Sequence, residues 1–221
     1  TMPQDHTKRF ESLQNQTNIG ILKDSKGAIW TYCGDALHKI TLDELGDIES
    51  IHTLPSIVPP LQFIAMYDVD MDGNIWAAMG TEVYKIYTSE SDKLRAVPAI
   101  EDFSFESGTI SYVIRTKENE VWIGTNNGLF RHSKNENKNK LYTYDRNNNR
   151  SISQDYITDL AITSDKQLVV STLRGLSVYN PISDDFEQIT LRGKTPDNGN
   201  RLNSNFLNCL FIDDDIIWIG S

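Results

Sequence analysis

A tryptophan cassette recurs along this chain at a nearly constant interval. Its copies are Ile29-Trp30, Ile75-Trp76, Val121-Trp122, Leu168-Val169 and Ile217-Trp218, with valine in place of the fourth tryptophan. Successive cassette positions are 46, 46, 47 and 49 residues apart. A period of this size, with apolar strand-like segments in every copy, is typical of a β-propeller or a related array whose units stack to bury their faces.

Each repeat divides into four short apolar runs that polar turn-forming residues separate. The innermost runs are predicted at residues 17–23, 61–68, 109–115, 156–162 and 206–212, and the outermost at 48–53, 94–97, 140–144 and 186–191. No run requires a helix. The sequence therefore predicts an all-β fold, a β-propeller fragment of four-stranded antiparallel blades with about four full blades plus parts of a fifth.

The predicted organisation is a single partial β-propeller over residues 1–221. Its repeats fall at approximately 14–60, 61–107, 108–154, 155–204 and an incomplete 205–221. Because the tryptophans recur at one blade position, we favour packing between blades over sugar stacking, with each indole N–H reaching a local acceptor. An open array would expose two blade faces. We therefore expect the fragment to close on its own ends or to self-associate.

The acidic run at residues 68–73 has two interpretations. Its alternating carboxylates are similar to the start of an EF-hand calcium loop. The twelfth position would be Met79 rather than a bidentate glutamate, and the corresponding segments of the other repeats are hairpin turns. We therefore favour a turn over a calcium site. The chain's four histidines lack the spacing of zinc ligands, and no metal or cofactor is expected; they are His6, His38, His52 and His132.

Residues 121–129 read Val-Trp-Ile-Gly-Thr-Asn-Asn-Gly-Leu, and residues 217–221 read Ile-Trp-Ile-Gly-Ser. Both segments resemble the two-component regulator propeller repeat. The first two repeats depart from the family pattern with Tyr32 and Ala78 at its first glycine, and the fourth has Ser171 there. The resemblance extends over nearly the whole chain, and its repetition makes it more specific than a single motif.

This resemblance implies the periplasmic sensor region of a hybrid two-component histidine kinase and response regulator. Such repeats usually form seven-bladed propellers, often two in tandem, in Gram-negative gut bacteria. The parent proteins continue through a β-sandwich, one membrane span and a histidine kinase, and they commonly detect glycan breakdown products. The resemblance therefore implies a periplasmic domain, without enzymatic activity of its own, that binds an oligosaccharide or another small envelope ligand.

Composition argues against two classes of partner. The formal net charge is −10, and lysine and arginine form no cluster, so direct nucleic-acid binding is not expected because phosphate neutralisation supplies most of that affinity. No apolar run approaches the roughly 20 residues of a membrane helix. Membrane contact is therefore expected only through segments outside this sequence. The two cysteines, Cys33 and Cys209, do not indicate a disulfide framework.

Candidate ligand-binding residues lie where a repeat departs from its neighbours inside a loop. They are Asn126 and Asn127 after the third tryptophan strand, Arg174 at the corresponding corner of the fourth repeat, and Arg150 between these repeats. Asparagine and arginine donate hydrogen bonds that suit sugar hydroxyls and carboxylates. The alternative is that asparagine-rich segments simply form loops. No nucleophile elbow, phosphate loop or metal signature points to a catalytic site.

Two functions are compatible with this sequence. The first is an extracytoplasmic ligand-sensing propeller of a hybrid two-component regulator, in which glycan binding shifts the population of receptor states and signals to a histidine kinase. The second is a propeller scaffold for protein–protein interaction without a small-molecule ligand. Binding of a soluble oligosaccharide would favour the first function. A large exposed apolar face on a complete propeller would favour the second.

Overall fold

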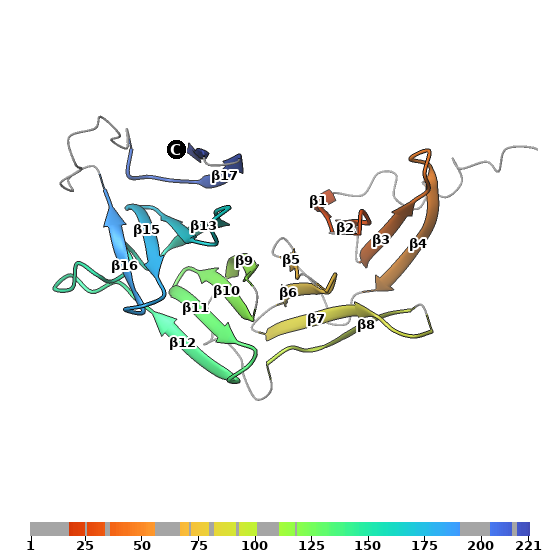
Figure 1. The fold of residues 1–221 in the computed structure, drawn as a ribbon, viewed down its shortest axis with the longest axis horizontal. Helices are drawn as coiled ribbons and strands as arrows, with labels where there is room; N and C mark the ends of the chain where they lie inside the picture. Colours follow the sequence, from red (N-terminus) through yellow and green to blue (C-terminus); the bar gives the residue numbers. More distant parts are fainter. Residues whose placement is uncertain are drawn as a thin grey trace, which may run out of the picture. The chain divides into compact units, whose positions relative to one another are not determined.

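The computed structural model describes residues 18–24, 26–33, 36–55, 67–70, 72–79, 82–91, 93–100, 111–117, 119–190, 204–213 and 216–221. The chain divides into two compact units, unit 1 (Thr1–Asp102) and unit 2 (Phe103–Ser221), and each is described by itself. All regular elements among the described residues are β-strands (Figure 1). None of these residues belongs to a helix long and apolar enough to cross a membrane.

Unit 1 contains two antiparallel sheets, blades 1 and 2, in which four strands pair in chain order. Blade 1 consists of β1 (Asn18–Lys23), β2 (Ile29–Cys33), β3 (Ala36–Leu42) and β4 (Ile48–Pro55). Blade 2 consists of β5 (Tyr67–Val69), β6 (Ile75–Met79), β7 (Glu82–Thr88) and β8 (Leu94–Pro98). The tryptophan cassette forms the second strand of each blade, as the repeat predicts.

Unit 2 contains blades 3 and 4, which have the same strand order, and a further sheet of two strands. Blade 3 consists of β9 (Ser111–Lys117), β10 (Glu120–Thr125), β11 (Gly128–Ser133) and β12 (Lys138–Tyr142). Blade 4 consists of β13 (Ile157–Ile162), β14 (Leu168–Thr172), β15 (Gly175–Asn180) and β16 (Asp185–Ile189). The last sheet pairs β17 (Cys209–Asp213) with β18 (Ile216–Gly220). The predicted four-stranded blades and the part of a fifth are confirmed.

Within each unit, the tryptophan face of one blade packs on the aliphatic face of the next. In unit 1, Trp30 of blade 1 shares a buried cluster with Ile75 and Ile86 of blade 2. In unit 2, blades 3 and 4 lie side by side (Figure 1), and Trp122 packs with Leu168. Burying such a side chain stabilises the fold by about 2–3 kcal/mol. Stacking is therefore the main source of stability in both units, since a single sheet would leave these faces in water.

An aspartate at the start of the β1–β2 turn holds both the turn and the tryptophan. Oδ1 of Asp24 accepts two backbone N–H groups of the turn, and Oδ2 accepts the indole N–H of Trp30 at 2.9 Å. Asp70 makes the corresponding bonds in the β5–β6 turn, with the Trp76 indole also at 2.9 Å. The expected local acceptor of the indole is thus present. The carboxylate of Asp70 thus serves the β5–β6 turn, as the turn interpretation predicts, whereas residues 68 and 69 belong to β5.

The outermost strand of blade 3 is displaced from its predicted position. The prediction for residues 140–144 is wrong by two residues, because the strand runs from Lys138 to Tyr142. The backbone N–H of Tyr144 donates to Oδ1 of Asp155 at 2.6 Å. That side-chain bond replaces a ladder bond to the neighbouring strand and ends the strand early.

The first strand of the last sheet starts later than the sequence predicts. It begins at Cys209 rather than at residue 206. The backbone N–H of Phe206 donates to the Ser204 hydroxyl at 3.0 Å, and that of Leu207 donates to the carbonyl of Thr172 at 3.3 Å. These bonds turn the segment before it joins the sheet. Of the innermost strand predicted at 61–68, residues 61–66 lie outside the described residues.

The two-stranded sheet exposes an apolar face. Phe211 and Trp218 are cross-strand partners, and 65% and 57% of their surfaces are exposed, whereas Trp30 and Trp122 are fully buried. The thiol of Cys209 is free and exposed. The side chain of Cys33 lies outside the described part of the chain. The face that stacks on a neighbouring blade elsewhere in unit 2 is therefore open on β17 and β18.

Candidate functional site

Two turns of unit 2 share one backbone design. The hydroxyl of Thr125, before the β10–β11 turn, accepts the N–H of Asn127 at 3.0 Å and donates to the carbonyl of Gly128 at 2.8 Å. Thr172 makes the same two bonds in the β14–β15 turn, including one at 3.0 Å from the N–H of Arg174. The threonine hydroxyl therefore fixes each turn, while Asn127 and Arg174 are exposed.

Glycine is required where each of these turns closes. Gly128 and Gly175 have φ angles of 118° and 121°. A Cβ atom there would lie 2.6 Å from the carbonyl oxygens of Tyr142 and Ile189, respectively. Side chains do not tolerate such an approach, and these φ values disfavour any residue but glycine. The Thr-x-x-Gly pattern thus sets the backbone and leaves two positions open for other chemistry.

The side chain of Arg174 lies over the ring of Tyr144, which begins the connection between blades 3 and 4. Its guanidinium carbon is 5.2 Å from the ring centroid, and Nη1 donates to the tyrosine hydroxyl at 3.1 Å. The carbonyl of Asp155 accepts the N–H of Gly128 at 2.9 Å, so the connection is tied to the β10–β11 turn. An exposed guanidinium on an aromatic ring is thereby held between two blades.

Three of the four predicted ligand-binding residues lie at this end of unit 2. Asn126 and Asn127 form the β10–β11 turn, and Arg174 lies in the β14–β15 turn. Because Arg174 contacts Tyr144 and Gly128 bonds Asp155, both of these turns lie against the segment that connects blades 3 and 4. These residues together offer amide and guanidinium donors next to an aromatic ring. Their role in binding stays a prediction.

The fourth predicted residue, Arg150, lies elsewhere. Its Nε and Nη2 atoms donate to the carboxylate of Asp185 at 2.5 and 2.7 Å, and Nη2 also reaches the Ser183 hydroxyl at 3.3 Å. These hydrogen bonds raise the pKa of Arg150 and lower the pKa of Asp185. Arg150 therefore anchors the connection between blades 3 and 4 to the β15–β16 turn, at the end of blade 4 opposite Arg174.

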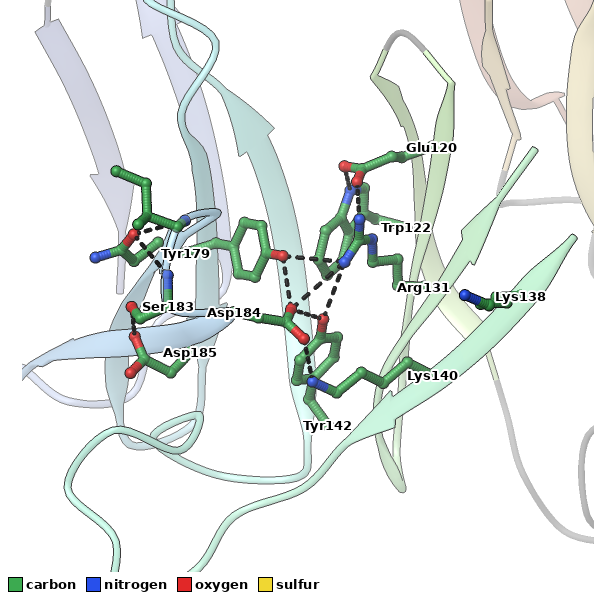
Figure 2. A network of polar contacts seen from close by, with 12 residues as sticks. Glu120, Trp122, Arg131, Lys138, Lys140, Tyr142, Tyr179, Ser183, Asp184 and Asp185 are labelled. Carbon is green, nitrogen blue, oxygen red and sulfur yellow. Dashed lines mark hydrogen bonds and ion pairs between the residues drawn. The ribbon is translucent and has the colours of Figure 1, made fainter. Parts of the chain in front are cut away.

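A polar cluster joins blades 3 and 4 near this second end (Figure 2). Its centre is Asp184, in the β15–β16 turn, which has a φ angle of 54°. Its Oδ1 atom accepts the hydroxyls of Tyr142 and, at 2.7 Å, Tyr179, while Oδ2 accepts Nζ of Lys140. Nη1 of Arg131 lies 3.4 Å from Oδ1. We call these five residues the clamp, because Arg131, Lys140 and Tyr142 of blade 3, together with Tyr179 of blade 4, hold a carboxylate of blade 4.

Arg131 links the clamp to the tryptophan of blade 3. Its guanidinium carbon lies 5.4 Å from the centroid of Trp122, and Nη2 pairs with Oε1 of Glu120. The indole N–H of Trp122 donates to Oε2 of the same glutamate at 3.0 Å. Figure 2 shows the guanidinium between Glu120 and the clamp carboxylate. One arginine thus connects two carboxylates and an aromatic face.

The clamp shifts the proton affinities of its members. Burial opposes ionisation of Asp184, but hydrogen bonds from Lys140, Tyr142 and Tyr179 outweigh it and lower the pKa to about 2. Burial and the bond to Asp184 raise the pKa of Tyr179. Burial also opposes the charge of Arg131, yet the hydroxyl of Tyr142 and the charge of Glu120 raise its pKa. At neutral pH the clamp therefore contains an ionised carboxylate and two cations.

Sequence reasoning missed the clamp, although one of its elements has a sequence signal. A cation follows the tryptophan by nine residues in the first three repeats, as Lys39, Lys85 and Arg131. In the structure each is the cross-strand partner of its tryptophan and lies over the ring. That spacing predicts the cation over the indole. It does not predict the carboxylate of the next blade.

Comparison with solved structures identifies propellers of similar fold. One is the extracellular domain of BT4673, an inferred one-component system of B. thetaiotaomicron, at 19% identity with a TM-score of 0.66, over 94% of this chain and 26% of that one. Another is the extracellular domain of BT3049, an inferred hybrid two-component system of B. thetaiotaomicron, at 19% identity and a TM-score of 0.59, over 93% and 26%. A third is virginiamycin B lyase from Staphylococcus aureus, at 15% identity and a TM-score of 0.61, over 93% and 64%.

These similarities establish the propeller fold and leave activity open, because sensor domains and a lyase share it. The chain spans about a quarter of the length of the two extracellular domains, 26% in each case. No protein-family model matches the sequence, and no curated protein matches it. The fold class predicted from the repeat is thus confirmed by structure rather than by sequence relatives.

Proposed function

We propose that this chain is part of the extracytoplasmic, periplasmic ligand-sensing propeller of a hybrid two-component regulator, and that it detects glycan breakdown products. The observation that carries the proposal is the fold shared with the extracellular domains of two bacterial signalling proteins, over 94% and 93% of this chain. The tryptophan repeat, which resembles that of such sensors, supports the same function. The propeller would bind its ligand without catalysing a reaction.

The end of unit 2 around Arg174 supplies hydrogen-bond donors and an aromatic ring for sugar binding. The guanidinium of Arg174 and the amide of Asn127 are exposed on turns of adjacent blades, and the ring of Tyr144 lies between them in sequence and contacts Arg174. A sugar that bridged both turns would bind best when the blades hold one spacing. Ligand binding would then favour one receptor arrangement over another.

Calorimetry of the full chain with neutral and uronic oligosaccharides tests the binding step. We expect at least one oligosaccharide to bind, and we expect Arg174→Gln and Asn127→Ala to weaken that binding, the former by about tenfold because it removes a charged donor. Lys138→Gln is the matched control, since Lys138 is exposed in β12 and lies at the other end of blade 3. Failure of every oligosaccharide to bind, or equal affinity in all variants, contradicts the proposal.

The coding sequence around this segment tests the signalling step. A hybrid regulator requires a membrane span and a histidine kinase in the same polypeptide. Deleting the propeller segment from such a gene should abolish the transcriptional response to the oligosaccharide that binds. A gene that encodes neither a membrane span nor a kinase would contradict the sensor function while leaving any measured sugar binding intact.

A scaffold for protein–protein interaction is the second candidate, and the open face of β17 and β18 favours it. Phe211 and Trp218 expose large apolar surfaces side by side, and such surfaces commonly mark interaction sites. Sedimentation of the chain tests this function. Self-association that Trp218→Ser removes would support a partner-binding face. A monomer at all concentrations would count against the chain itself as that partner.

The proposal that this chain catalyses no reaction can be tested directly, because virginiamycin B lyase, which has a similar fold, is an enzyme. We expect incubation of the chain with virginiamycin B to leave the antibiotic intact, as measured by mass spectrometry against a lyase control. Cleavage at a rate above the uncatalysed one would replace the sensor proposal with an enzymatic one.

A further inference from the structure

The contact between Arg174 and Tyr144 repeats an arginine–tyrosine pair that is also found in the clamp. In the clamp, Nη1 of Arg131 donates to the Tyr179 hydroxyl at 3.1 Å, and the guanidinium carbon lies 5.8 Å from the centroid of that ring. For Arg174 and Tyr144 the same two distances are 3.1 and 5.2 Å. Unit 2 therefore contains the same arrangement of donors twice.

In the clamp, a carboxylate completes this arrangement (Figure 2). The hydroxyl of Tyr179 accepts the arginine N–H and donates its own hydrogen to Oδ1 of Asp184 at 2.7 Å. Nη1 of Arg131 lies 3.4 Å from the same oxygen. A hydroxyl that accepts a hydrogen bond from a cation becomes a better donor, because linked hydrogen bonds polarise one another. The guanidinium and the hydroxyl thus act together on one carboxylate.

The second pair has no such carboxylate. Among the described residues, Arg174 forms no ion pair, whereas Arg131 and Arg150 each pair with acidic side chains. The Tyr144 hydroxyl accepts the hydrogen bond from Arg174, and within the same part of the chain it donates to no acceptor. Arg174 is exposed and Tyr144 is partly exposed. A dissolved anion can therefore reach both donors.

The acidic side chains closest in sequence to Tyr144 already hold backbone groups. Oδ1 of Asp155 accepts the N–H of Tyr144 at 2.6 Å, and Oδ1 of Asp145 accepts the N–H of Asn147 at 2.8 Å. Their charges, in a chain whose net charge is −10, oppose non-specific attraction of anions. An anion at Arg174 must therefore gain its affinity from directed hydrogen bonds. A planar carboxylate meets this need, because it matches the fork of the guanidinium.

We propose that the Arg174–Tyr144 pair binds the carboxylate of a uronic acid, so that this site selects acidic over neutral oligosaccharides. The carboxylate would accept from the guanidinium and the tyrosine hydroxyl, as Asp184 does in the clamp. A uronic acid is favoured over a simple carboxylate because its ring hydroxyls can accept from the exposed amide of Asn127 on the adjacent turn. The uronate site rests on the proposed sensing of glycans, since it lies on the same turns.

Calorimetry of the full chain with trigalacturonate and its trimethyl ester tests the carboxylate. The ester keeps the ring hydroxyls but loses the charges, so the acid should bind about tenfold more tightly. Arg174→Lys keeps the charge but loses the fork, and it should reduce this preference about fivefold. Tyr144→Phe keeps the ring but loses the hydroxyl, and it should reduce the preference about threefold. Arg146→Gln removes an exposed arginine of the same connection and should leave the preference unchanged.

The preference for acid over ester distinguishes recognition of the carboxylate from a structural role of the contact. If Arg174 only held the connection in place, its replacement would weaken the acid and the ester equally. Equal binding of acid and ester by the wild type, or an unchanged preference in both Arg174→Lys and Tyr144→Phe, overturns the uronate site and leaves glycan sensing intact.

Two further ligands separate this site from the proposed function. Tricarballylate has three carboxylates and no sugar ring, so it should bind about fivefold more weakly than trigalacturonate or worse. Equal binding of the two would overturn recognition of a uronic acid. Maltotriose is a neutral sugar, and binding of maltotriose without either galacturonide would overturn the uronate site alone. Failure of every sugar to bind would overturn both the site and the sensing of glycans.

Discussion

The two units satisfy the buried indole in different ways, and the contrast separates two tasks. In unit 1, Asp24 holds a turn and the indole of Trp30 with one carboxylate. In unit 2, Glu120 on strand β10 accepts the indole of Trp122 and pairs with Arg131, and the arginine extends the contact to the next blade. Stacking of the tryptophan is common to both. The carboxylate that accepts the indole N–H can therefore differ between blades. An aspartate in the turn also stabilises that turn, whereas a glutamate on the strand also links two blades through an arginine.

Removing the carboxylate of Asp24, which holds both the β1–β2 turn and the indole of Trp30, should have the largest effect on stability. Asp24→Ala leaves two turn N–H groups and a buried indole N–H without their acceptor, which should cost about 3 kcal/mol of unfolding free energy. Asp43→Ala is the matched control, since Asp43 accepts two turn N–H groups in an exposed turn and no indole, and it should cost about 1 kcal/mol. Urea unfolding measures both. Equal losses would show that the indole bond contributes nothing.

Replacing a turn glycine should have the next largest effect. Gly175→Ala places a Cβ atom 2.6 Å from the carbonyl oxygen of Ile189 at a φ angle of 121°, so we expect a loss of about 2 kcal/mol or more. Gly46→Ala, in the β3–β4 turn, has a φ angle of 84° and no atom within 4 Å. It should cost only about 1 kcal/mol. A larger loss for Gly46→Ala would refute the clash as the cause.

Breaking the clamp should have a smaller, pH-dependent effect. The folded-state pKa of Asp184 is about 2, below the ordinary value of about 3.9, so its stabilisation is present above pH 4 and lost as the pH falls toward 2. Because the side chain is 41% exposed, solvent screening limits the contribution to about 1 kcal/mol.

Asp184→Asn should therefore destabilise the protein at pH 6 and lose most of that disadvantage only as the pH falls to about 2. Urea midpoints of both proteins across this range are the measurement. Arg150 pairs with the adjacent Asp185, and Arg150→Gln serves as the control for a general effect on the β15–β16 turn. A constant difference between Asp184→Asn and wild type at every pH would mean that the carboxylate charge is not what stabilises the clamp.

The smallest effect is expected where unit 1 lacks a clamp. Lys39→Gln removes a cation that lies over Trp30 and an exposed bond to Thr88, which should cost about 0.5 kcal/mol or less. High salt should shrink this difference further, because the cation is partly exposed. Thermal unfolding at low and high salt measures it. A loss as large as that of Asp24→Ala would mean that unit 1 depends on its cation more than on its turn carboxylate.

The blades could be predicted from the sequence because residues close together in the chain determine them. The contacts between blades could not be predicted, because they join residues far apart in the chain. The tryptophan strands and the Asp24 turn follow from alternation and turn residues within a few positions of each other. The bond between Arg131 and Asp184 spans 53 residues and exists only because two sheets stack. Strand ends were missed where a side chain competes for a ladder N–H, as Asp155 does for Tyr144. The binding residues were chosen by position, and only those on blade turns share one end.

The Thr-x-x-Gly turn gives this fold an evolutionary freedom that its seams lack. The hydroxyl of Thr125 and the glycine three residues later fix the path of the backbone in blade 3. Thr172 and its glycine do the same in blade 4. The two residues between threonine and glycine can therefore differ completely, and they are Asn-Asn in one blade and Leu-Arg in the other. Mutations at these paired positions leave the stacked interior untouched. A propeller of such repeats can therefore acquire a new recognition surface through a few exchanges per blade, at almost no cost in foldability.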